Sequence, residues 1–194
     1  IQKTMEDIDG IDIAKQRSFQ NIKDIKTMID WNIENDINVM RLSSNIFPHL
    51  SNWKMTKCET MVDPILFEEY QTLDWCRTEL EDIGKYANDK KHRLTFHPGQ
   101  YNQVGAQSRE VYEKTILDLG LHAKIFDIMG MGPNSIMVIH GGGVYKNKGE
   151  TIDRWKRQFL EMPEAIRDRL VFENCEKSYC IEDIIPISEY LNIP

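Results

Sequence analysis

The strongest constraint on this chain is a regular alternation between helical segments and short apolar runs. In the helical segments apolar residues recur every three or four positions, and each of the first four segments leads into a run rich in Val, Ile, Leu and Phe. The first spacing is typical of amphipathic helices, and a short apolar run is typical of a buried strand. The pattern predicts helices over 18–35, 64–88, 108–129, 151–167 and 181–191, and strands over 37–42, 93–97, 136–140 and 169–173.

Strands separated by helices pair in parallel, because a parallel neighbour requires a long crossover connection. The order of the segments therefore predicts an α/β architecture, and the length of 194 residues suits a single domain over residues 1–194. The strands read as continuous apolar runs, which is typical of a sheet covered on both faces. A (β/α) barrel of the TIM type is an architecture that meets these expectations.

Each predicted strand ends on polar residues: Arg41 lies near the end of the first, and His97, His140 and Glu173 end the next three. Parallel strands bring their carboxyl ends to one rim, where the active sites of barrels lie. Taken singly, a strand-end histidine is commonly a core or capping group, and Arg41 an ion-pair partner. Two imidazoles and a carboxylate together favour a site for Mn, Zn or Fe. Such a metal can assist the hydrolysis of a phosphate ester.

The loops after two of these strands have distinctive sequences. Pro98 and Gly99 predict a turn that presents Gln100 and Tyr101. The glycines of Gly141–Gly143 lack side chains, so that a substrate or a metal could approach the backbone closely. On their own, the exposed pair could be ordinary rim residues and the glycines only a tight turn.

Two other histidines are expected to lie outside the site. His122 falls in the middle of a helix beside its apolar face, which predicts a structural role. His92 precedes a strand among basic residues and is expected to be exposed.

Composition narrows the class of protein. The formal net charge of −7 argues against a protein that coats DNA through a general excess of Lys and Arg. No apolar stretch approaches the roughly 18 to 20 residues that span a bilayer, so no membrane association is expected. The cysteines form no CxxC pair and no dense disulfide framework, which favours reduced thiols and an intracellular protein; they are Cys58, Cys76, Cys175 and Cys180.

Four ordered segments resemble motifs of the UV damage endonuclease family, and the resemblance covers about residues 17 to 194. The first matches an RxSSxxxP pattern, the second HPGQ(Y/F), the third HxGGxxxxK and the fourth (L/V)ENxE(K/R). The segments in this chain are Arg41-Leu42-Ser43-Ser44 with Phe47-Pro48, Thr95–Tyr101, Ile139–Tyr145 with Lys148, and Leu170–Lys177.

The resemblance implies a TIM barrel with divalent metal ions at its rim, usually Mn²⁺, with Zn²⁺ or Mg²⁺ as alternatives. It also implies an enzyme that nicks damaged double-stranded DNA immediately 5′ to UV photoproducts and some other lesions. Carried over motif by motif, the catalytic metal ligands would be His97, His140 and Glu173. The residues that contact DNA or probe the lesion would be Gln100, Tyr101, Lys148 and Arg41.

Two departures from the family pattern accompany the resemblance. The family has a metal-ligand histidine where this chain has Asn52, with His49 three residues earlier. The family also has eight barrel strands, of which about the second to the fifth are recognisable here. The domain is therefore expected to be truncated at both ends.

Two alternatives remain at this stage. The chain could belong to another metal-dependent barrel enzyme, such as an abasic-site endonuclease or a xylose-isomerase-like protein; a sugar isomerase has no reason to present Gln100 and Tyr101. It could also be a non-catalytic module that binds damaged DNA. Metal content separates this second alternative from the others, since a binding module need hold no metal.

Overall fold

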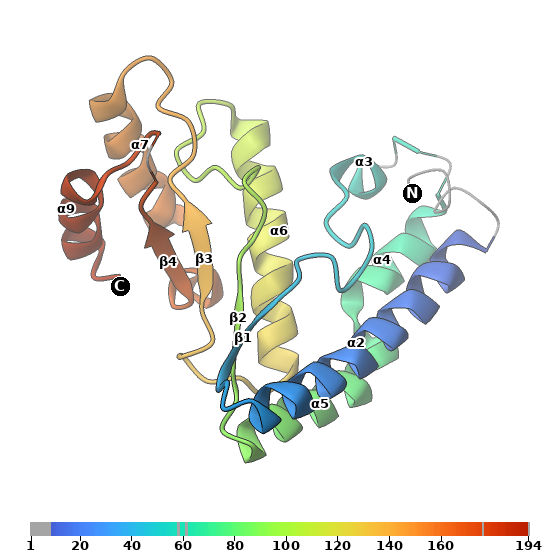
Figure 1. Cartoon of the computed structure of the whole chain (residues 1–194). Helices are drawn as coiled ribbons and strands as arrows, with labels where there is room; N and C mark the ends of the chain where they lie inside the picture. Colours follow the sequence, from blue (N-terminus) through green and yellow to red (C-terminus); the bar gives the residue numbers. More distant parts are fainter. Residues whose placement is uncertain (1–8, 58, 61, 176, 194) are drawn as a thin grey trace. The chain divides into compact units, whose positions relative to one another are not determined.

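The structure, a computed structural model, describes residues 9–57, 59–60, 62–175 and 177–193. Helices and strands alternate along it as predicted (Figure 1). Of the residues singled out above, Cys58 and Glu176 lie outside the described ones. The elements are α2 Gly10–Glu34, β1 Val39–Leu42, α3 Trp53–Thr56, α4 Pro64–Thr72, η1 Asp74–Cys76, α5 Arg77–Asp89, β2 Arg93–Phe96, α6 Arg109–Ile128, β3 Met137–His140, α7 Lys148–Glu161, α8 Glu164–Arg167, β4 Leu170–Glu173 and α9 Ile181–Leu191.

The chain comprises two compact units. The first takes in the chain up to Leu94 together with Ile125–Gly132, and the second takes in Thr95–Lys124 and the chain from Pro133 onwards. Hydrogen bonds join the strands in the order β1-β2-β3-β4, and β2 pairs with β3, and β3 with β4, in parallel. The predicted α/β class with parallel strands is confirmed.

In the first unit, α2 buries one face built from isoleucines spaced three and four residues apart. Ile22, Ile25 and Ile29 are buried as the periodicity predicted. The helix begins at Gly10 rather than near residue 18, because Ile11 and Ala14 continue the buried face towards the N-terminus. Hydrophobic burial, more than a capping side chain, therefore sets where this helix starts.

The prediction of a single helix over 64–88 is wrong in one respect, because the helix is interrupted between α4 and α5. Leu73 ends α4 with a φ of 62°, in the left-handed region that side chains with a Cβ disfavour. Its side chain is fully buried, and the Thr72 hydroxyl accepts a hydrogen bond from the Asp74 N–H at 3.1 Å. We infer that burial of the leucine offsets the backbone strain at this corner.

The helix predicted over 151–167 is also divided, into α7 and α8. Met162 adopts an extended conformation with ψ of 150°, as expected for a residue that precedes proline. Pro163 then leads into α8. At its other end α7 starts before the predicted residue 151, since the Asn147 side chain caps it by accepting a hydrogen bond from the Glu150 N–H at 3.2 Å.

The core of the second unit is a set of stacked aromatic rings between α7 and β4. Trp155 lies parallel to Phe159 and to Phe172, with ring centroids 5.6 Å and 4.7 Å away. Tyr179, from the segment after β4, is tilted against Phe172 at 5.5 Å. All four side chains are buried, so this stack fixes α7 and the segment after β4 to the strand between them.

The two histidines expected outside the site differ in how well they were predicted. His122 is buried in α6, as predicted. The prediction that His92 is exposed is wrong, because only 2% of its surface is accessible. It lies in the turn before β2, where its Nε2 is 3.1 Å from the Asn32 amide nitrogen of α2. The neighbouring lysines point to solvent while the imidazole packs inwards.

Cys76 and Cys180 are free thiols, and burial raises the pKa of the Cys76 thiol to about 12, which keeps it protonated and unreactive. Within the described ranges, no helix combines the length and the apolar character needed to cross a bilayer.

We expect acid to destabilise the protein partly through His92. Burial lowers the pKa of this imidazole, whereas in the unfolded chain it lies at about 6.5. Below that pH the unfolded state binds a proton that the folded state resists. The stability is therefore fully present above about pH 6.5 and is lost as the pH falls through the lower folded pKa. His92→Gln removes this titration. The melting temperature of the variant should therefore fall less than that of the wild type when the pH is lowered from about 7.5 to 5.

The matched comparison is His49→Gln, because burial also lowers the pKa of His49. Each variant should remove its own part of the acid sensitivity. An unchanged pH profile of the melting temperature in His92→Gln would contradict the assignment.

Candidate metal centre

Three polar side chains lie where β2, β3 and β4 end. His140 and Glu173 are the last residues of β3 and β4, and the register pairs them directly. His97 follows Phe96, the last residue of β2, which pairs with Met137 of β3. Alternate residues of a strand share a face, so the register places His97 on the same face as the other two. The convergence predicted from the strand ends is present.

The two faces of these strands differ in burial. One face packs against helices, for example where Trp155 of α7 stacks on Phe172 of β4. The other face, which carries the three candidate residues, is only partly buried at Thr95, Val138 and Val171. The prediction that the strands are covered on both faces is therefore wrong for the described residues. Their helices cover one face, and the candidate residues point from the other.

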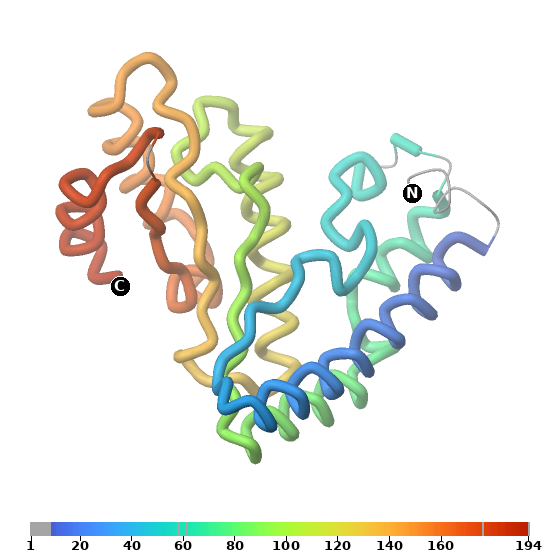
Figure 2. The backbone as a smooth tube through the Cα atoms, in the orientation of Figure 1, coloured from blue at the N-terminus to red at the C-terminus, as the bar shows by residue number. Residues whose placement is uncertain are grey.

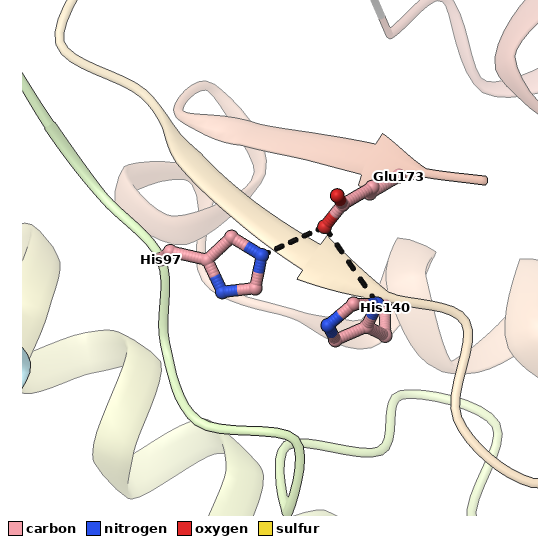
Figure 3. A group of neighbouring side chains, drawn as sticks. All are labelled: His97, His140 and Glu173. Atoms are coloured by element: carbon pink, nitrogen blue, oxygen red, sulfur yellow. Dashed lines mark hydrogen bonds and ion pairs between the residues drawn. The ribbon is translucent and has the colours of Figure 1, made fainter. Parts of the chain in front are cut away.

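The three side chains point towards one another (Figure 3). The His97 Nε2 is 2.7 Å from the Glu173 Oε2, and the His140 Nδ1 is 3.6 Å from the same oxygen. The two imidazole rings have centroids 5.0 Å apart and are inclined at 65°. One ligand atom from each residue lies within 4.8 Å of the others. Glu173 is thus the common partner of both rings.

This donor set fits a divalent transition metal. Two imidazole nitrogens and a carboxylate oxygen suit Mn, Zn or Fe. Ligand atoms about 2.1 Å from one ion lie roughly 3 to 3.5 Å from each other, which is close to the spacing found here. The side chains are 19%, 37% and 39% exposed for His97, His140 and Glu173, so an ion and a further ligand can reach them.

The loop after β2 presents the predicted exposed pair. Gln100 and Tyr101 are exposed, and Tyr101 has 82% of its surface accessible. The residues that follow turn inwards: Asn102, Val104 and Ala106 are buried. An aromatic side chain of this exposure is unusual on a well-packed loop, since burial would stabilise it.

Packing and backbone conformation each explain why glycine stands at a position after β3. A Cβ at Gly141 would lie 2.6 Å from the Phe172 ring and would also collide with Tyr179. Gly142 has a φ of +83°, a conformation that residues with side chains rarely adopt. The sequence suggested either close approach of a ligand or a tight turn for these glycines, whereas Gly141 is required by the aromatic core.

Comparison with known proteins identifies the family. The family model described as UV-endonuclease UvdE matches residues 1–194. The chain belongs to the UvdE family. It is 34% identical over 190 residues to a UV-damage endonuclease of Schizosaccharomyces pombe, covering 96% of this chain and 29% of that protein. A protein of Acanthamoeba polyphaga mimivirus is 36% identical over 187 residues, covering 95% of this chain and 53% of that protein.

A solved structure supports the same assignment. The crystal structure of SacUVDE superposes with a TM-score of 0.83 at 30% identity, covering 94% of this chain and 58% of that one. The match confirms the predicted fold class, an incomplete TIM-type (β/α) barrel. The chain spans about half the length, or less, of the curated UvdE relatives described above.

Lys148, a candidate for DNA contact, is engaged by a neighbour in the structure. It is the first residue of α7, and its Nζ lies 2.6 Å from the Asp183 carboxylate in the first turn of α9. That hydrogen bond raises the pKa of Lys148 and lowers the pKa of Asp183. The same Asp183 oxygen accepts a hydrogen bond from the Cys180 N–H at 2.9 Å. Lys148 therefore joins the first turns of α7 and α9, the helices that follow the loops after β3 and β4.

The remaining candidates lie in the first unit. Arg41 is exposed on β1. Asn52, which stands where the UvdE pattern has a histidine, caps α3 by accepting hydrogen bonds from the Lys54 and Met55 N–H groups at 3.1 Å and 3.5 Å. The His49 Nδ1 is 3.4 Å from the Asn52 amide nitrogen, and burial lowers the pKa of His49. In the described structure Asn52 thus serves as a helix cap.

The sequence did not indicate several residues that pair with one another in the segments that follow β2, β3 and β4. Asp183, the partner of Lys148, was not singled out. Neither were Gln103 and Tyr145, although the Tyr145 hydroxyl donates a hydrogen bond to the Gln103 side-chain oxygen. These partners are separated by 35 and 42 residues in the sequence. No local pattern in the sequence could have indicated such pairings.

We expect Gly141→Ala to destabilise the second unit. The new methyl group would overlap the rings of Phe172 and Tyr179, and overpacking of this kind costs about 1 to 3 kcal/mol. Chemical denaturation should report the loss as a lower free energy of unfolding.

Gly143→Ala is the matched control. The nearest atom to a Cβ at Gly143 is 3.5 Å away, an ordinary contact distance. Equal stabilities of Gly141→Ala and Gly143→Ala would show that the aromatic core does not require Gly141.

Proposed function

We propose that this chain contributes metal ligands to a DNA-repair endonuclease that nicks damaged double-stranded DNA 5′ to UV photoproducts and some other lesions. The reaction would be hydrolysis of a phosphodiester bond. The observation that carries the proposal is the convergence of His97, His140 and Glu173 on the partly exposed face of three consecutive strands. Membership of the UvdE family supports it.

The three residues would act together as ligands. Their imidazole nitrogens and carboxylate oxygen would hold a divalent cation, for which we propose Mn²⁺, with Zn²⁺ or Mg²⁺ as alternatives. When bound, such an ion supplies Lewis acidity towards the phosphate and the attacking water. Glu173 lies between the two imidazoles, so that its negative charge offsets part of the charge of the ion and orients both rings.

Gln100 and Tyr101 would recognise the damage. Their exposure on a turn beside His97 suits side chains that enter a duplex between stacked bases. Unstacking costs a few kcal/mol and costs least at a damaged step. Selection of the site would therefore come from the ease of deforming the DNA rather than from the pattern of base edges.

Cations would contact the DNA backbone, which has a repeating negative charge. We assign this role to Arg41, which is exposed on β1, and to Lys148, whose side chain is 42% exposed within its pair with Asp183. As DNA is the proposed substrate, we expect the protein to act inside the cell.

The test is nicking of supercoiled plasmid, UV-irradiated against untreated, by the full-length protein encoded by the gene of this chain, with and without Mn²⁺. We expect nicks that require both the metal and the irradiation. His97→Ala should lower the rate by more than about 100-fold, because loss of outer partners of a metal site alone costs roughly 10- to 100-fold. The variant should also bind less Mn²⁺ in equilibrium dialysis.

His92→Gln serves as the matched control, because it changes a histidine outside the cluster. It should nick and bind Mn²⁺ as the wild type does. Irradiated DNA left intact by the wild type in the presence of metal would rule out the repair function. Retained Mn²⁺ binding in His97→Ala would rule out the assigned ligand set. A wild type that binds damaged DNA but holds no metal would favour a binding module.

A further inference from the structure

Gln100 and Tyr101 occupy the two corner positions of a turn that a single residue closes. The Asn102 N–H donates a hydrogen bond to the Gly99 carbonyl at 3.0 Å, and the Asn102 side-chain Nδ2 donates a second to the same oxygen at 3.1 Å. A turn normally has at most the first of these bonds. Asn102 therefore fixes the conformation from which both exposed side chains project.

The same side chain ties the turn to α6. Asn102 is only 5% exposed, and its Nδ2 also donates to the Asp118 Oδ2 at 2.7 Å. A hydrogen bond between an amide and a carboxylate is shorter and stronger than one between neutral groups. Both hydrogens of the Asn102 amide are thus used, one within the turn and one on the helix.

Asp118 is itself held in place from the interior. The next turn of α6 carries the buried His122, whose Nδ1 donates to the Asp118 carbonyl at 2.7 Å, since a carbonyl can only accept. The His122 ring packs edge-on against Phe96 at 4.7 Å. Phe96 is the residue directly before His97. The contact between His122 and Phe96 therefore connects the helix that holds the turn to the strand that carries the candidate metal ligand.

The residues after the turn are held by further contacts. The Gln103 N–H donates to the Thr115 hydroxyl of α6 at 2.9 Å. From α7, the Arg154 Nε donates to the Gly105 carbonyl at 2.8 Å, and the Gln158 Nε2 donates to that of Ala106 at 3.2 Å. The connection from β2 to α6 can be followed in Figure 2. Its tip is exposed, while the remainder is fixed to two helices.

We propose that Asn102 and Asp118 are positioning residues that lock Gln100 and Tyr101 in a projecting arrangement before DNA binds. This inference rests on the proposed function, since it assigns the rigidity of the turn to lesion probing. A side chain that enters a duplex must hold its direction against base stacking. A preformed turn avoids the entropy cost of ordering the loop at that moment. With a mobile turn, the two side chains would no longer discriminate between stiff intact DNA and deformable damaged DNA.

The pair can be broken by a change that preserves its shape. Asn102→Asp removes both side-chain N–H groups and sets a carboxylate against the Asp118 carboxylate. Asp118→Asn keeps an oxygen that can accept from Asn102 and should behave nearly as the wild type. The double variant Asn102→Asp with Asp118→Asn restores a donor opposite an acceptor and should recover part of the loss. Glu110→Gln is the matched control, since Glu110 pairs with Lys114 elsewhere on α6.

The primary measurement, on the full-length protein with Mn²⁺, is the ratio of nicking rates on irradiated and untreated plasmid. Asn102→Asp should lower this ratio by roughly 10-fold, within the range that small misplacements of functional groups cause. Mn²⁺ binding should be unchanged, because no ligand is altered. A second measurement, without metal, follows 2-aminopurine placed beside a lesion. Its fluorescence should rise with the wild type, as bases unstack, and rise less with Asn102→Asp.

Hydrogen–deuterium exchange of the loop tests the inference independently of activity. Asn102→Asp should speed exchange over residues 99–106, with the wild-type rate retained elsewhere. Unchanged exchange in that loop would overturn the positioning role whatever the protein does to DNA. Faster exchange with an unchanged nicking ratio and unchanged 2-aminopurine signal would also overturn it. A wild type that nicks no irradiated DNA would instead refute the proposed function.

Discussion

The in-register parallel pairing of β3 and β4 is the constraint on which the second unit depends. It pairs Ile139 with Phe172 on one face and His140 with Glu173 on the other. Both residues of the first pair are buried and Phe172 belongs to the aromatic core, whereas the second pair belongs to the candidate metal centre. Because side chains alternate along a strand, a slip of one residue would exchange the two faces and bury a carboxylate among aromatic rings. The packing that stabilises the unit therefore also assembles the site.

The segments that follow β3 and β4 are also held against the aromatic core. Gly141 directly follows His140 and packs against Phe172 and Tyr179, so that the backbone leaving β3 is pressed onto the core. Lys148 and Asp183 then join the starts of α7 and α9 by an ion pair. Exposed ion pairs contribute little to stability. The aromatic contacts are therefore the more important support.

The sequence predicted those features that depend on local pattern. Periodicity identified each strand to within two residues at either end, and strand ends identified His97, His140 and Glu173, because parallel strands gather their carboxyl ends. The prediction from the sequence failed at Leu73, where the chain turns through a left-handed conformation that no sequence pattern specified. It also failed at His92, whose burial comes from packing against α2. The partners Asn102 and Asp118 lie on different elements and could be paired only once β2, the loop and α6 were in place.

Two neighbouring residues in the loop after β2, Tyr101 and Asn102, differ sharply in exposure. Tyr101 is exposed at a cost, since its ring would stabilise the fold if it were buried. Asn102, next to it, is almost wholly buried and uses both of its amide hydrogens. A buried amide that donates both of its hydrogens defines one conformation more strictly than apolar packing does. The backbone of an exposed aromatic residue attached to such a group is held without a partner for the ring, which leaves the ring available for the proposed contact with DNA.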